Sequence, residues 1–303
     1  MLVVLLGTAS ALVYGVSDFF GGVASRTQPA LHVTIGAFAI AAVLDAPVLA
    51  VGSPAWSAAA LGTGALGGVC GGIGTWLFYA ALARGPVGVV APAVALIAAV
   101  LPALVGLLRG EPIGLLTAVA LVAVVCAGAL LSVERQAHLR PDRTTVLLIL
   151  AAGIPYGTYL VVIGLSPADS GAVPLEADLV VSTLLLLGVL AVQRLRRAAP
   201  GAPLDRPGPR GRPSGFRRAV LRAPAERRGL VIAAGLSQAV AGVLLVFALH
   251  LPALAIVGAL SALYPVGTVV LGILVLHERA RPFQIAGMVL AIGGVALLAL
   301  ARA

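Results

Sequence analysis

Long apolar stretches alternate with short polar breaks along the whole chain, and this pattern restricts it to the structures that a lipid bilayer permits. Ten stretches are each near the ~20 residues that a helix needs to cross the hydrocarbon core. Of the 303 residues, 60% are hydrophobic and 10% are charged, whereas about 25% of a soluble domain is charged. The sequence therefore predicts an all-α polytopic membrane protein with ten transmembrane helices. The predicted helices lie at 2–24, 30–51, 57–83, 87–109, 112–133, 145–165, 172–193, 229–250, 253–276 and 281–302.

The ten stretches divide into two sets of five, because a short acidic turn joins the fourth and fifth of each set. These turns contain Glu111 and Glu278, which coincide when the sequence is shifted by 167 residues. Five is an odd number, so the two sets must enter the membrane from opposite sides. We expect two inverted five-helix repeats, 1–133 and 145–303, joined by a linker at 134–144. Inverted repeats of this kind are typical of secondary transporters, whose substrate site lies between the repeats.

The stretch 194–228 is the largest hydrophilic part of the sequence. It contains eleven Arg against only Asp205 and Glu226, together with several Pro and Gly. This composition predicts a largely disordered loop that faces anionic lipid headgroups, with a short amphipathic helix at 216–222. Nucleic-acid binding is a second explanation of such a basic loop, and we do not expect it.

Arginine is distributed unevenly between the two sides of the predicted bundle. The loops after odd-numbered helices hold 18 Arg, whereas the other side holds only Arg109 and Arg302. The positive-inside rule places the basic loops in the cytoplasm. Both chain termini are then expected outside.

Motifs for catalysis or for a tightly bound group are not recognisable in the sequence. The stretch 62–67 matches a dinucleotide-binding pattern, but it lies inside an apolar span and follows no strand. His277 and Glu278 do not form a metalloprotease motif, because Arg281 stands where the second His would be. We expect no enzyme activity, no cofactor and no metal. The third span instead carries small residues at helical spacing that predict close helix packing: Gly64, Gly67, Gly68, Gly71 and Gly72.

Asp18 is the charge that most directly suggests a functional site. It lies about six residues inside the end of the first span, or ~9 Å deep. An ionisable group at such depth is costly and is a functional hypothesis by default. A second interpretation is a structural carboxylate that binds Ser17 or a nearby Arg, and the sequence does not decide between the two.

Polar and aromatic residues within the spans are few, and several adjoin helix-breaking Pro or Gly. Irregular backbone inside a membrane is tolerated where it is buried in protein or lines a cavity. We therefore expect a substrate path among Tyr14, Asp18, Trp76, Tyr79, Tyr156, Tyr159, Gln238 and Tyr264. Helix packing or an interfacial belt is an equally open explanation for any single one of these aromatic residues. Glu111 and Glu278 open two helices, where the helix dipole favours a carboxylate, and we expect them to be structural.

Several features of the chain resemble the drug/metabolite transporter superfamily, specifically its EamA branch of ten-helix proteins. They are the Tyr14-Gly15 pair, the run from Tyr79 to Ala83, the Gly110-Glu111 turn, and a weaker second copy at Glu278. The resemblance implies a pseudo-symmetric bundle with a central cavity and secondary transport of small metabolites, often export. Members of the family usually have both termini in the cytoplasm, which is opposite to the orientation that the arginines favour.

The sequence thus favours a carrier, a multi-pass protein of a bacterial cytoplasmic membrane, that exports a small organic metabolite by alternating access. Its expected partners are that small-molecule substrate and the lipid bilayer, and its oligomeric state stays open. Two alternatives have weaker support. One is a non-transporting scaffold or sensor that uses the basic loop 194–228. The other is a membrane-embedded lipid-modifying enzyme, which the scattered positions of the four His disfavour.

Overall fold

The computed structural model of the chain describes residues 1–50, 54–85, 87–110, 114–131, 142–198, 224–251, 256–257, 260, 263–276 and 282–300. This part of the chain is nearly all helical and contains no β-strand. The all-α class that the composition predicts is therefore observed. The α-helices are α1 (Leu2–Ser25), α2 (Ala30–Asp45), α3 (Ala58–Leu82), α4 (Val87–Leu108), α5 (Leu115–Leu131), α6 (Arg143–Gly164), α7 (Val173–Ala198), α9 (Pro224–Leu249), α11 (Tyr264–Leu276) and α12 (Pro282–Leu300).

Seven helices in the described ranges are long and apolar enough to cross a membrane: α1, α2 with its 3₁₀ extension, α3, α4, α6, α7 and α9. Shorter apolar segments lie in α5 and α12. The 24 residues of α1 extend about 36 Å, which exceeds the ~30 Å hydrocarbon core. Large side chains on the outside are apolar as well, with Leu5, Val43 and Leu184 all more than 60% exposed. A bilayer, rather than water, is the solvent that such a surface fits.

Most observed helices begin and end within five residues of the predicted spans. The second span is different, because α2 ends at Asp45 and continues as a 3₁₀ helix, η1 (Ala46–Ala50). Pro47 explains the change, since it lacks the N–H that would bond to the carbonyl of Val43. Helix α7 continues to Ala198, past its predicted end at 193. The predicted span 253–276 is described only at 256–257, at 260 and over α11.

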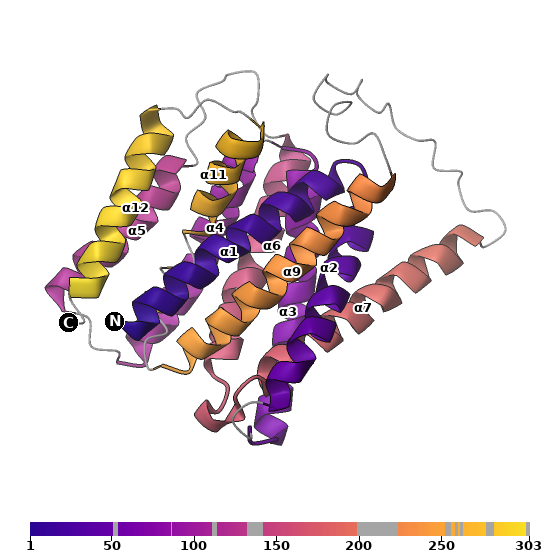
Figure 1. The fold of residues 1–303 in the computed structure, drawn as a ribbon, viewed down its shortest axis with the longest axis horizontal. Helices are drawn as coiled ribbons and strands as arrows, with labels where there is room; N and C mark the ends of the chain where they lie inside the picture. The colour runs from indigo at the N-terminus through magenta and orange to yellow at the C-terminus, as the bar shows by residue number, and fades with distance from the viewer. Residues whose placement is uncertain are drawn as a thin grey trace.

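The helices pack into one bundle in which elements from the two halves of the chain alternate (Figure 1). Helix α1 lies along α9, and α3 lies between α6 and α7. Helix α2 contacts α7 and α9, while α4 contacts α6 and α11 contacts α1. Helices α5 and α12 pack against each other at one edge, beside α1 in Figure 1. Residues from both halves therefore meet in the interior.

The glycines of α3 bring two neighbouring helices close to its backbone. A Cβ atom on Gly68 would lie 2.6 Å from the carbonyl oxygen of Asp178, and one on Gly64 would lie 2.5 Å from that of Pro174, both on α7. On the adjoining face, a Cβ on Gly67 would lie 2.7 Å from the Ile163 side chain of α6. The predicted close packing of the third helix is confirmed, and its small residues serve two neighbours instead of one.

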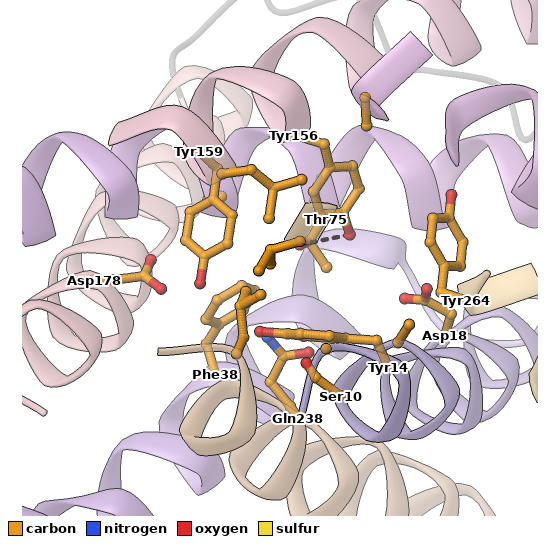
Figure 2. A pocket seen from close by; sticks show the side chains of 17 residues that line it. Ser10, Tyr14, Asp18, Phe38, Thr75, Tyr156, Tyr159, Asp178, Gln238 and Tyr264 are labelled. Atoms are coloured by element: carbon orange, nitrogen blue, oxygen red, sulfur yellow. Dashed lines mark hydrogen bonds between the residues drawn. The ribbon is translucent and has the colours of Figure 1, made fainter. Parts of the chain in front are cut away.

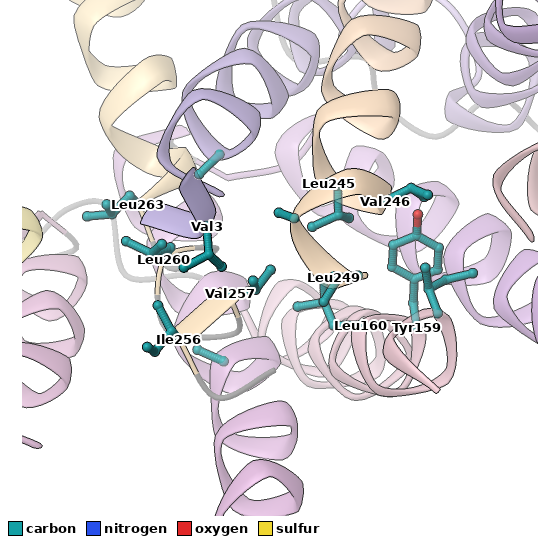
Figure 3. Packing of buried hydrophobic residues seen from close by; sticks show 14 of the residues in the cluster. Val3, Tyr159, Leu160, Leu245, Val246, Leu249, Ile256, Val257, Leu260 and Leu263 are labelled. Carbon is teal, nitrogen blue, oxygen red and sulfur yellow. The ribbon is translucent and has the colours of Figure 1, made fainter. Parts of the chain in front are cut away.

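Two clusters of buried apolar residues lie at different levels of the bundle. The first joins the beginning of α1 to the ends of α6 and α9 (Figure 3) and includes Val3, Leu160, Leu245, Leu249 and Leu260. The second joins the beginnings of α4 and α6 to the ends of α1 and α3 and includes Ala24, Phe78, Leu82, Val90 and Ile149. Along α1 and α6, the residues between these two levels line the cavity described next.

Candidate functional site

A cavity lies inside the bundle and is lined by α1, α2, α3, α4, α6, α7, α9, α11 and Val257 (Figure 2). The centres of water molecules can reach about 60 Å³ of it. One water needs about 10–15 Å³ by this measure, so the cavity has room for roughly four to six waters. Its polar lining consists of Ser10, Tyr14, Asp18, Thr75, Tyr156, Tyr159, Asp178, Gln238 and Tyr264.

Helix α1 contributes the largest share of the polar wall. Gly7, Ala11, Tyr14 and Asp18 follow one another at intervals of three or four residues and therefore lie on one face of the helix. On the same helix, the Ser10 hydroxyl donates a hydrogen bond of 2.8 Å to the Ala241 carbonyl. This bond ties the cavity face of α1 to α9.

A second tie between α1 and α9 lies beside Gln238. The Ser17 hydroxyl is 2.9 Å from the Ala234 carbonyl oxygen and 3.3 Å from Gln238 Oε1. Close approach of α1 to α11 depends on Gly15, since a Cβ there would lie 2.9 Å from Gly267 Cα. The polar face of α1 is thus held from two sides.

Tyr156 and Tyr264 both pack against the buried Phe78. Each phenol ring packs edge-on against Phe78 with a centroid distance of 5.9 Å. The Tyr156 hydroxyl pairs with the Thr75 hydroxyl at 2.9 Å, and the Tyr264 hydroxyl donates to the Ala91 carbonyl at 2.6 Å. Both hydroxyls are therefore engaged by the protein, which fixes the orientation of the two rings.

Two carboxylates face the cavity from opposite sides, Asp18 on α1 and Asp178 on α7 (Figure 2). Asp178 is 2% exposed and accepts a hydrogen bond of 3.1 Å from Ser182. Gly71 makes room for it, because a Cβ there would lie 3.3 Å from Asp178 Oδ1 and 3.2 Å from the Tyr159 ring. Asp18 is 5% exposed, and no described residue forms a hydrogen bond or ion pair with it. Ser17, one of the two partners that the structural interpretation of Asp18 offered, does not bond to it among the described contacts, because Ser17 bonds to α9 instead.

Six of the eight side chains expected along a substrate path line the cavity: Tyr14, Asp18, Tyr156, Tyr159, Gln238 and Tyr264. The other two, Trp76 and Tyr79, do not line it. Tyr79 is fully buried against Gly21 of α1, and its hydroxyl has no partner among the described residues. Glu111 and Glu278 lie outside the described residues.

Asp178, Thr75, Ser10 and Phe38 also line the cavity and were not among the expected residues. Asp178 lies near the start of the predicted span 172–193, so its position in the sequence alone does not show that it is buried. The glycine face of α3 instead draws the first turns of α7 into the bundle and buries this carboxylate. The spacing of Asp178 and Ser182, four residues apart on one helix face, was the available signal.

The described residues contain no group of three or more His, Cys, Asp or Glu that could hold a metal ion. Among the described residues, the cavity lining offers a ligand aliphatic side chains, aromatic rings, hydroxyls, one amide and two carboxylates.

Comparison with known proteins places the chain among helical membrane proteins. The model of the EamA-like transporter family matches residues 143–300. A solved structure titled "Crystal structure of protein" aligns with a TM-score of 0.63 over 98% of this chain and 96% of that chain. The two sequences are 18% identical, so this likeness concerns the fold alone. No curated protein matches the chain.

Proposed function

Since the chain belongs to the EamA-like transporter family, we propose that it is a secondary transporter that exports a small organic metabolite by alternating access. We place it in the cytoplasmic membrane. The observation that carries the proposal is a cavity, lined in part by polar side chains, inside an apolar helical bundle. Polar groups inside a membrane protein are costly and cluster along substrate and ion pathways.

Contacts between the two halves support the inverted repeat that this mechanism uses. If the repeat holds, α6 corresponds to α1, α9 to α3, and α11 to α4. Helix α1 lies along α9 just as α6 lies along α3, and α1 contacts α11 just as α6 contacts α4. Two equivalent glycines allow these close contacts. Gly15 of α1 lies against α11, and a Cβ atom on Gly157 of α6 would lie 2.8 Å from the Ala98 carbonyl oxygen of α4. In such folds the substrate site lies at the interface between the repeats.

Alternating access needs a barrier on each side of the site, with only one barrier open at a time. The two buried apolar clusters lie at positions where they could form these barriers. The cluster around Leu245 and Leu249 adjoins one end of the cavity, and the cluster around Phe78 and Leu82 lies toward the other ends of the same helices. Both are packed in the observed conformation, so transport would open them in turn.

Asp18 is the residue that we assign to energy coupling. It faces the cavity without a partner among the described residues, so binding and release of a proton there need break no internal hydrogen bond. Asp18→Asn keeps the size of the side chain but cannot take up a proton. It should therefore reach the membrane at normal levels and lose transport driven by a pH gradient, while exchange of substrate without a gradient survives.

The test begins with a comparison of extracellular metabolites from cells that overexpress the chain or the Asp18→Asn variant. A solute that accumulates only with the unchanged chain is then tested in proteoliposomes with an imposed pH step. Gradient-driven flux that is unchanged in Asp18→Asn would leave Asp18 a structural residue. Absence of any flux from the unchanged chain, for every solute that the screen yields, would refute the transporter assignment.

A further inference from the structure

We propose that the cavity selects a small organic cation, whose ammonium group lies between the Asp18 carboxylate and the rings of Tyr14, Tyr156 and Tyr264. The inference rests on the proposed transport function and assigns its substrate class. It draws on the charge of the lining, on the unpartnered carboxylate, on the way the tyrosines are held, and on the size of the cavity.

Among the described residues, the lining carries ionisable acids and no basic group. The acids are Asp18 and Asp178, and no Arg or His is among the described lining residues. All basic residues of the sequence are Arg or His. In an interior of low dielectric constant, an unpaired negative solute beside two carboxylates would be strongly repelled. The cavity therefore disfavours anionic metabolites and favours a positive group.

Asp18 provides a buried acceptor for the positive group of the ligand. Its side chain is 5% exposed, lines the cavity, and has no hydrogen-bond or ion-pair partner in the described part of the chain. A buried carboxylate without a partner is strongly unfavourable, so it is stabilised either by a proton or by a cationic ligand. Asp178 differs, because the Ser182 hydroxyl lies 3.1 Å from its Oδ1 and shares its proton between Asp178 and the Gly68 carbonyl, which is 2.8 Å away. Of the two acids, Asp18 is the one whose need for a counter-charge the protein leaves unmet.

Three tyrosines line the same cavity as this carboxylate: Tyr14, Tyr156 and Tyr264. The hydroxyls of Tyr156 and Tyr264 are committed to Thr75 and to the Ala91 carbonyl. What these two residues present to a ligand is consequently the ring. A cation is the ligand that gains most from aromatic rings beside a carboxylate.

The cavity volume limits the size of the cation. Space for roughly four to six waters, at about 30 Å³ of liquid each, corresponds to a solute of about 120–180 Å³. Choline is close to this size and methylammonium is smaller, so both can be accommodated. Choline also has a neutral isostere, 3,3-dimethyl-1-butanol, in which carbon replaces nitrogen. The pair separates the effect of charge from the effect of shape.

Binding is measured on the purified full-length chain in detergent, with radiolabelled choline in equilibrium dialysis and the other compounds as competitors. We expect choline to bind at least tenfold more tightly than 3,3-dimethyl-1-butanol. Asp18→Asn should weaken choline binding at least tenfold and remove the preference for charge. Asp45→Asn is the matched control, because it neutralises a carboxylate that is 4% exposed and outside the cavity, and it should leave choline binding unchanged.

Equal affinity for choline and its isostere would overturn the proposal, as would saturable binding of neither choline nor methylammonium. So would unchanged choline binding in Asp18→Asn when its melting temperature matches that of the unchanged chain. These results are distinct from a failure of the transporter assignment. If the cavity is accessible from both sides of the membrane but does not prefer the cation, the transport proposal still holds and only the proposed substrate class is wrong.

Discussion

Substituting Gly68 with Ala tests whether the close contact between α3 and α7 holds the cavity together. The new Cβ would lie 2.6 Å from the Asp178 carbonyl oxygen, 2.9 Å from Val181 Cβ and 3.1 Å from the Ser182 nitrogen. Ordinary contact begins at 3.4 Å, so the two helices must separate by about 0.8 Å at this point. Two of the three atoms are backbone, which cannot rotate away. Overpacking of this kind costs about 1–3 kcal/mol.

The assay is the apparent melting temperature of the purified protein in one detergent, read together with the binding of choline. A loss of 1 kcal/mol lowers Tm by about 2–4 °C in proteins of 150–250 residues, so Gly68→Ala should lose several degrees. Gly62→Ala on the same helix is the control, because nothing lies within 4 Å of its Cβ position. Ala is a better helix former than Gly by about 0.5–1 kcal/mol, so Gly62→Ala should be neutral or stabilising. Equal melting temperatures for the two variants would refute the packing argument.

Three further predictions concern the orientation, the basic loop and a helix cap. If the arginine distribution sets the orientation, a reporter that fluoresces only in the cytoplasm should stay dark when fused at Ala303, and a bright signal would favour the orientation usual in the family. Deleting 200–214 should leave expression and detergent stability nearly unchanged, because a shorter surface loop changes the closure entropy little; a large loss of Tm would mean that the loop packs on the bundle. Asp142→Ala should lower Tm at neutral pH more than Asp142→Asn. The Thr145 hydroxyl and N–H bond to the Asp142 carboxylate and hold its pKa below the usual value, so the stabilisation is present above that value and disappears as the pH falls through the lowered pKa. Equal melting curves for the two variants across pH would refute this capping role.

The sequence predicts the helices well, because length and hydrophobicity decide whether a segment spans a membrane. It also predicts that α3 packs closely, since Gly64, Gly68 and Gly72 recur at helical spacing. Local sequence alone predicts part of the cavity wall that α1 forms, because Tyr14 and Asp18 are four residues apart and must share a face of the helix. The sequence does not specify which neighbouring helix each helix face contacts.

The differences between the expected residues and the observed cavity lining follow from that limit. Thr75 lines the cavity and the adjacent Trp76 does not, although Trp76 is the more conspicuous residue in sequence. The difference is set by which face of α3 turns toward α6, where Thr75 meets Tyr156. Asp178 was missed for the same reason, because its burial depends on a contact with glycines more than 100 residues away in the chain. Whether such a residue is buried or lines the cavity depends on tertiary packing, which cannot be deduced from a single sequence.

Alternating access makes one direct requirement, which is that the same cavity residue be reachable from each side of the membrane in turn. Ser10 lines the cavity, and Cys is its most conservative reactive replacement. The background is the chain with Cys70→Ala and Cys126→Ala, since both native cysteines are free. Ser182→Cys serves as the control, because Ser182 is as buried as Ser10 and is likewise bonded to a backbone carbonyl, but it lies outside the cavity lining.

The decisive measurement is the labelling of Ser10→Cys by a membrane-impermeant methanethiosulfonate in sealed vesicles of each orientation. Our account predicts labelling of Ser10→Cys from both faces and no labelling of Ser182→Cys from either face. Labelling of Ser10→Cys from one face only, or from neither, would contradict the claim that this cavity is a transport pathway.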